Sequence, residues 1–119
     1  AHSKFEFELI EIDLTGNKLQ KTSEISKVLF SFHFLKKINL AFNNLSECLE
    51  LPPQIESLIL NNNKLKKIDD TILTLKSLVT IDLSNNSLQD VTSLITLTKL
   101  KHVFLKNNKV NCLQQSDEI

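Results

Sequence analysis

One pattern of apolar positions occurs five times along the chain. In each copy, leucine, isoleucine or valine occupies positions 1, 4, 6 and 11, and asparagine occupies position 9. The copies begin at residues 9, 35, 55, 78 and 100. The alternation around positions 4 and 6 predicts a short strand with one apolar face. One copy cannot bury that face alone, so the pattern predicts five copies stacked in parallel.

The longest link between copies spans residues 22–34 and is predicted to form a helix. Thr22 or Ser23 can serve as its N-cap. Its apolar residues fall at helical spacing: Ile25, Val28, Leu29 and Phe32. The next link, residues 46–54, contains Pro52 and Pro53, which exclude a helix and favour an extended segment.

The two later links are predicted to be short helical or 3₁₀ turns with apolar residues directed inward. Those residues are Ile68, Ile72 and Leu75, then Val91, Leu94 and Leu97. Before the first copy, Phe5, Phe7 and Leu9 alternate with glutamates, which predicts additional strand at that end of the stack.

The motif L-x-x-L-x-L-x-x-N-x-L resembles the leucine-rich repeat family over nearly the whole chain. Around Leu51–Leu65 the short repeat is similar to those of bacterial secreted effectors. The last two links instead resemble 22-residue repeats of intracellular eukaryotic proteins such as phosphatase regulators. The resemblance implies a right-handed α/β solenoid with a parallel sheet on its concave face. Short helices, 3₁₀ turns or extended segments would then form the convex face.

The five motif asparagines are predicted to be structural. Each follows a strand where the chain turns and leaves inward-facing backbone groups, which one carboxamide can satisfy as donor and acceptor. The expected buried ladder consists of Asn17, Asn43, Asn63, Asn86 and Asn108.

Composition agrees with a single domain over residues 1–119. The chain is 41% hydrophobic, and its 14 basic and 14 acidic residues cancel. No overall field would therefore attract nucleic acid or an anionic membrane. The sequence shows neither a long apolar span nor a signal peptide. No polar cap follows the fifth copy, so either the chain is a fragment of a longer protein or that end meets another surface.

The cysteines favour a reducing, intracellular location, cytoplasmic or nuclear, with a secreted pathogen effector as the alternative. Cys48 and Cys112 are too few for a disulfide scaffold. They lie three stacking steps apart, which is roughly 14 Å at the usual strand spacing. A disulfide between them is therefore excluded. Sequons at Asn44 and Asn85 are expected to arise by accident in a motif rich in asparagine and serine.

The resemblance places a partner-binding surface on the concave face, at positions between the motif leucines. Large apolar residues at exposed positions could anchor a partner, although isolated ones are ordinary on any surface. Phe42, Ile59 and Phe104 are of this kind. The full candidate set is Asp13, Asn39, Phe42, Ile59, Asn61, Asp82, Ser84, His102, Phe104 and Lys106.

The sequence gives little support to catalysis. His2, His33 and His102 are expected to lie far apart, so no metal site or histidine dyad is predicted. Asp13 and Asp82 are separated by three copies, too far for paired-carboxylate chemistry. We expect no catalytic residue, metal, cofactor or small-molecule substrate.

We therefore interpret the chain as a non-catalytic adaptor, scaffold or targeting module that binds a protein of unknown identity through its concave face. One alternative is an RNA-binding module of an RNA-processing or export particle. The lysines that lean toward the later copies would suit RNA, but they fit a solvated face better and nucleic acid is not the expected partner. Another alternative is a structural module that associates through its C-terminal edge.

Overall fold

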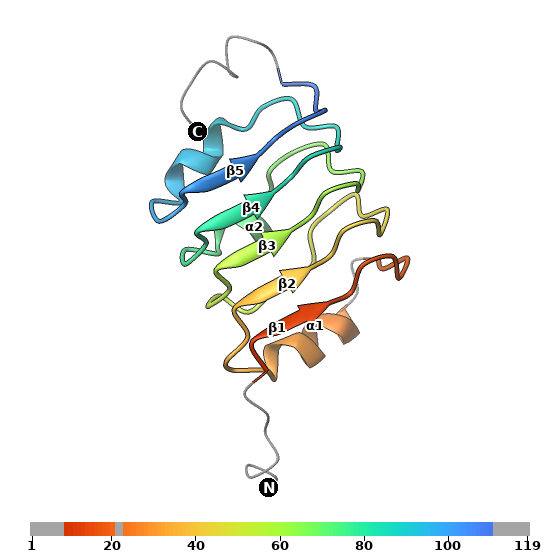
Figure 1. The fold of residues 1–119 in the computed structure, drawn as a ribbon, viewed down its shortest axis with the longest axis vertical. Coiled ribbons are helices and arrows are strands. Elements are labelled where there is room, and N and C mark those ends of the chain that lie inside the picture. The colour runs from red at the N-terminus through yellow and green to blue at the C-terminus, as the bar shows by residue number, and fades with distance from the viewer. Residues whose placement is uncertain (1–8, 21–22, 111–119) are drawn as a thin grey trace, which may run out of the picture.

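A computed structural model describes residues 9–20 and 23–110. Five strands form one parallel sheet in chain order, from β1 at one end of the stack to β5 at the other (Figure 1). The strands are β1 (Glu11–Asp13), β2 (Lys37–Asn39), β3 (Ser57–Ile59), β4 (Thr80–Asp82) and β5 (His102–Phe104). Each strand coincides with one copy of the motif, which confirms the predicted parallel solenoid.

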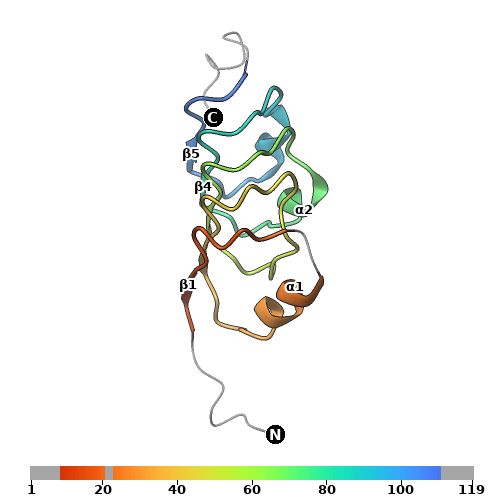
Figure 2. The same ribbon diagram turned by 90° about the vertical axis from the view of Figure 1, so that its right-hand side faces the viewer.

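The helices cover one side of this sheet (Figure 2). They are α1 (Ser23–Phe30), α2 (Asp70–Leu73) and the 3₁₀ helix η2 (Thr92–Thr96). Residues 46–54 contain no helix, as the two prolines predict. The two later links form the short helical turns that were expected. Asp69 caps α2 by accepting a hydrogen bond from the Ile72 N–H at 3.4 Å.

Helix α1 is shorter than the predicted span of residues 22–34. After Phe30 the chain tightens into turns in which each N–H bonds three residues back. The Ser31 N–H donates to Val28 at 3.1 Å and the Phe32 N–H donates to Leu29 at 3.2 Å. The apolar periodicity continues through these turns, so it did not mark where the α-helix ends.

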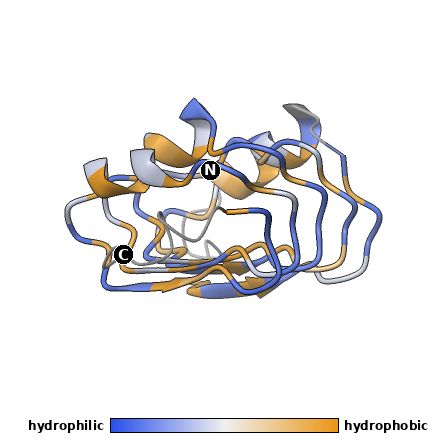
Figure 3. Cartoon of the chain, turned by 90° about the horizontal axis from the view of Figure 1, so that it is seen from above, coloured by the Kyte–Doolittle hydropathy of each residue, from blue (hydrophilic) through white to orange (hydrophobic). Residues whose placement is uncertain are grey.

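The core lies between the sheet and the helical layer, where the chain forms a flattened coil when viewed along the stack (Figure 3). Motif position 4 pairs in register through all five strands, as Ile12, Ile38, Leu58, Ile81 and Val103. The three central members are fully buried, whereas the two at the ends are half-buried. Each full burial of such a side chain contributes about 1.5–3 kcal/mol, so the solenoid is held together mainly by its middle repeats.

The asparagine ladder forms at the turns, with Asn43, Asn63 and Asn86 buried. The Asn63 carboxamide shows the pattern. Its oxygen accepts hydrogen bonds from the N–H groups of Asn43 and Leu45 at 3.1 and 2.9 Å. Its nitrogen donates to the carbonyls of Leu40 and Leu60, each at 3.0 Å. Each carboxamide thus joins its own turn to that of the preceding repeat.

The ends of the ladder depart from the prediction. Asn17 is exposed, and its side chain donates to the Thr15 carbonyl in its own turn at 3.3 Å. Among the described residues no motif turn precedes Asn17, and its carboxamide bonds within its own turn. Asn108 is half-buried but bonds in the expected way, donating to the Leu83 carbonyl at 2.8 Å. The predicted buried ladder is therefore wrong at Asn17 and incomplete at Asn108.

Some sequence predictions fall outside the described residues. These are the strand at Phe5–Phe7, the N-cap at Thr22 and the positions of His2 and Cys112. Cys48 is described and is a buried thiol.

Candidate functional site

The concave face, defined here as the sheet face turned away from α1, α2 and η2, carries the predicted binding residues. One row crosses all five strands in register: Asp13, Asn39, Ile59, Asp82 and Phe104. His102 lies at the start of β5, while Asn61, Ser84 and Lys106 follow their strands in the turns. The structure therefore brings most of the predicted site residues together on one surface.

Three polar residues of this row are engaged by their own turns. Asp13 accepts a hydrogen bond from the Thr15 N–H, Asn39 from the Ala41 N–H and Asp82 from the Ser84 N–H, each at 3.0 Å. These are Asx turns, in which a side-chain oxygen caps a backbone donor two residues on. The sequence interpretation missed this structural role, although Asp or Asn just before a turn is its signal.

The Asx turn in the first repeat also changes the acidity of Asp13. Hydrogen bonds from the Thr15 hydroxyl and from the Thr15 N–H hold the pKa of the Asp13 carboxyl below its usual value. Outside the concave face, Thr92 lowers the pKa of Asp90 in the same way. Both turns therefore favour an ionised carboxylate.

Ile59 and Phe104 occupy the same row, but their side chains have no oxygen that could accept a hydrogen bond from the turn. Within residues 9–20 and 23–110, no group accepts a hydrogen bond from the N–H of Asn61 or Lys106. Ile59 is half-buried between neighbouring strands rather than exposed as predicted, while Phe104 is 52% exposed. Repeats 3 and 5 thus each combine an apolar side chain with an uncapped backbone donor.

Phe42 lies in the turn after β2 and has an unusual backbone conformation. Its φ is +60°, in the left-handed region that bulky residues rarely adopt, and its ring is 57% exposed. The equivalent residues of the other repeats also have positive φ but are glycine or asparagine: Gly16, Asn62, Asn85 and Asn107. Phe42 is thus a strained exception within its column.

The column that contains Phe42 carries a second, surface chain of asparagines. Asn107 donates to Asn85 at 2.8 Å, and Asn85 donates to Asn62 at 3.4 Å. The chain stops at repeat 2, where Phe42 has no polar atom to continue it. The three predicted anchors therefore do not form one apolar patch, since Asp82 separates Ile59 from Phe104 and Phe42 stands among polar turns.

Charges on and beside the sheet are exposed and weakly paired. Lys37 lies 3.9 Å from Glu11, and Lys36 lies 3.5 Å from Glu56. Pairs this exposed contribute little to stability. The later repeats differ, because residues 91–110 include four lysines and one histidine but no aspartate or glutamate. The stretch of chain around β5 is therefore basic.

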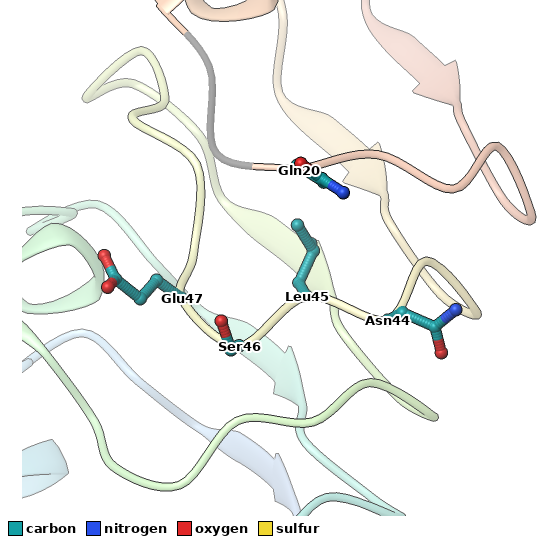
Figure 4. A pocket seen from close by; sticks show the side chains of 5 residues that line it. All are labelled: Gln20, Asn44, Leu45, Ser46 and Glu47. Carbon is teal, nitrogen blue, oxygen red and sulfur yellow. The ribbon is translucent and has the colours of Figure 1, made fainter.

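The described part of the chain offers no arrangement suited to metal chemistry. It contains no group of three or more His, Cys, Asp or Glu side chains able to hold a metal ion. A hollow of about 410 Å³ lies between the first two repeats, where Gln20 faces Leu45 (Figure 4). Asn44, Ser46 and Glu47 complete its lining. Among the described residues, no helix is long and apolar enough to cross a bilayer.

Sequence reasoning also missed a set of apolar residues exposed away from the concave row. Val28 and Phe30 of α1 are 52% and 44% exposed, and Ile95 of η2 is 81% exposed. Ile10 and Phe34 are exposed beside β1 and before β2. The sequence placed Val28 in the apolar stripe of the predicted helix, because periodicity does not separate the edge of such a stripe from its centre.

The fold and its asparagine ladder define a parallel solenoid of short strands and helical links. Residues 53–113 match the leucine-rich repeat family model, and the chain belongs to this family.

Its relatives differ widely in their names. It is 31% identical to the tubulin-specific chaperone E of Xenopus laevis over 98% of this chain and 24% of that protein. It is 31% identical to a protein phosphatase 1 regulatory inhibitor subunit homologue of Arabidopsis thaliana, over 93% of this chain and 35% of that protein. It is 32% identical to a probable U2 small nuclear ribonucleoprotein A′ of Drosophila melanogaster, over 85% of this chain and 39% of that protein. The chain thus spans roughly a quarter to two fifths of these relatives.

Proposed function

We propose that the chain is a non-catalytic module that binds a partner protein through its concave face and works inside the cell, in the cytoplasm or nucleus. The observation that carries this proposal is the ordered row across the five strands, in which three structurally engaged polar residues accompany Ile59 and Phe104. Interfaces commonly place a few apolar anchors within such a polar surround.

The relatives' names support a binding role. One is a chaperone and another is a regulatory inhibitor subunit, and both names describe proteins that act on other proteins. The concave face is built on strands whose register is fixed by the buried core and the asparagine ladder. It therefore presents its side chains at constant spacing, as recognition of a folded or extended partner requires.

The test is affinity capture from lysate of the source cells with the wild-type chain and an Ile59→Asp, Phe104→Asp variant. The matched control is Val28→Asp, Ile95→Asp, which places the same charges at exposed apolar positions on the helical side. Circular dichroism and urea unfolding establish that all three chains are folded. We expect one protein to be retained by the wild type and the control but lost by the concave variant. Retention by all three chains would contradict the proposal.

RNA is the second candidate, favoured by the acid-free stretch of residues 91–110 and by the ribonucleoprotein among the relatives. It predicts RNA binding whose affinity falls steeply with salt. Replacing Lys99, Lys101, Lys106 and Lys109 with glutamine would abolish that binding. No RNA binding by the wild type, or RNA binding unaffected by these four changes, would exclude the RNA-based role.

A further inference from the structure

The turn after each strand presents one backbone N–H to the concave face. In repeats 1, 2 and 4 this donor is capped by the side-chain oxygen of Asp13, Asn39 or Asp82. In repeats 3 and 5, Ile59 and Phe104 supply no such oxygen, and the position beside this uncapped N–H is here named the vacant seat. The same backbone therefore offers an internally filled seat in three repeats and a vacant seat in two.

We propose that the vacant seat of repeat 5 receives an aspartate or glutamate side chain of a partner protein. Its carboxylate would accept the hydrogen bond from the Lys106 N–H while an apolar neighbour in the partner contacts the Phe104 ring. This inference rests on the proposed function, because it names the chemistry by which the concave face recognises a protein.

The filled seats show which group the vacant seat suits. In repeats 1 and 4 the occupant is a carboxylate, and at Asp13 the hydrogen bonds from Thr15 keep the carboxyl pKa low. The residue equivalent to Thr15 is Lys106 in repeat 5, an exposed residue whose side chain carries a positive charge in place of a hydroxyl. A hydrogen bond from a backbone N–H to an ionised acceptor is stronger than one to a neutral acceptor, which favours a carboxylate from the partner.

The electrostatic surroundings of repeat 5 agree with an anionic ligand. Lys99, Lys101, Lys106 and Lys109 are all exposed, and residues 91–110 contain no acidic side chain. Asp82 is the registered neighbour of Phe104, but it already accepts a hydrogen bond from the Ser84 N–H. Local charge therefore complements a partner carboxylate at this end of the sheet.

Repeat 5 is favoured over repeat 3 by access and by charge. Ile59 and Asn61 are half-buried between strands on both sides, whereas Phe104 and Lys106 are exposed on the last described strand. Repeat 3 has asparagine, Asn61, at the position where repeat 5 has Lys106. A protein carboxylate is favoured over an RNA phosphate because the filled seats hold single carboxylate or carboxamide oxygens.

The experiment follows the Lys106 amide by ¹⁵N NMR during titration with two peptides. The probe is acetyl-Glu-Leu-Glu-Leu-Glu-amide, and its neutral match has glutamine in place of each glutamate. We expect the acidic peptide to move the Lys106 amide proton downfield and to saturate. The glutamine peptide should bind at least tenfold more weakly, because it lacks the ionised acceptor.

Three variants of Phe104 distinguish the effect of filling the vacant seat from the effects of a new charge and of losing the aromatic ring. Phe104→Asn fills the seat with a neutral group, as Asn39 does in repeat 2, and should abolish the response of Lys106. Phe104→Asp should do the same and should also shift the free protein's Lys106 amide downfield. Phe104→Leu leaves the seat vacant and should keep the response. All three substitutions are at the exposed residue Phe104, and the NMR spectrum of each variant shows whether its fold is intact.

Several outcomes overturn the inference. The inference fails if the chemical shift of the Lys106 amide does not change, or if the two peptides bind equally well. It also fails if Phe104→Asn binds the acidic peptide as the wild type does, or if decauridylate RNA at equal concentration shifts the Lys106 amide more than the peptide. If concave variants still lose a captured protein while the two peptides behave alike, the proposed function stands and the carboxylate seat fails. If the captured protein does not depend on the concave face, the proposed function itself fails.

Discussion

The side-chain oxygen of Asn63 accepts a hydrogen bond from the backbone N–H of Asn43, 20 residues earlier, at 3.1 Å. The same oxygen serves the Leu45 N–H, and the amide nitrogen serves two carbonyls. One buried carboxamide thus satisfies polar groups in two consecutive turns. Uncompensated, such groups each cost free energy in the folded state.

Replacing Asn63 with leucine should lower the free energy of unfolding by about 3 kcal/mol, because several buried donors and acceptors lose their partner. Urea unfolding followed by circular dichroism measures this loss. Asn17→Leu is the matched control, because Asn17 is exposed and bonds within its own turn. Equal losses in the two variants would show that burial within the ladder does not matter.

Replacing Phe42 with asparagine should raise the free energy of unfolding by about 1 kcal/mol, since a bulky residue is strained at positive φ. Asparagine is the residue found at the equivalent position of repeats 3, 4 and 5. Thermal and urea unfolding provide the measurement. Phe34→Asn is the control, because Phe34 is 49% exposed but has no positive φ. A comparable gain in the control would mean that lost apolar exposure, and not relieved strain, explains the result.

The predicted fold agreed closely with the structure because the buried positions are periodic. Ile38, Leu58 and Ile81 recur with fixed offsets from an asparagine, and few arrangements other than a parallel stack bury all of them. The end of α1 was less predictable, because the apolar spacing of a helix continues through turns that bond three residues back.

The candidate surface could be located from the sequence, but the roles of its residues could not. Asp82 was assigned to a partner, yet it caps the Ser84 N–H within its own chain. Its side chain is short enough to reach its own turn, and spacing along the sequence does not distinguish that bond from one to a partner. Ile59 was expected to be exposed, but neighbouring strands cover part of it because the sheet continues on both sides.

Acid should destabilise the protein in part through Asp13 and Asp90, whose carboxyl pKa values are lowered from 3.8 in the folded state by threonine hydrogen bonds. The unfolded chain therefore binds more protons near that pH, and stability rises with pH there. The contribution is present above about pH 4 and is lost as the pH falls through the lowered values.

An Asp13→Asn, Asp90→Asn variant should consequently lose less stability than the wild type between about pH 5 and pH 2.5. The urea midpoint at each pH gives the comparison. Glu50→Gln, which removes an exposed carboxylate elsewhere, should leave the acid sensitivity closer to that of the wild type. An unchanged acid slope in the double variant would show that these two turns do not contribute.

Cys48 should resist thiol reagents as long as the protein is folded, because its side chain is buried in the core. In a Cys112→Ser background, reaction with 5,5′-dithiobis(2-nitrobenzoic acid) should proceed at the rate of unfolding and should accelerate with urea. Fast labelling under native conditions would contradict the packing described for repeat 2.

The hydrogen bonds of the asparagine ladder also relate each repeat to the order in which the repeats are synthesised. The oxygens of Asn43, Asn63, Asn86 and Asn108 all accept hydrogen bonds from the preceding repeat. During synthesis, therefore, backbone N–H groups in the turns of the first four repeats lack their acceptor until the next repeat has left the ribosome. Deleting the last repeat should leave the Leu88 N–H of repeat 4 without its acceptor, whereas deleting the first should leave the buried Asn43 oxygen without its two donors. These backbone N–H groups thus form their hydrogen bonds to the ladder only with the repeat that is synthesised after them.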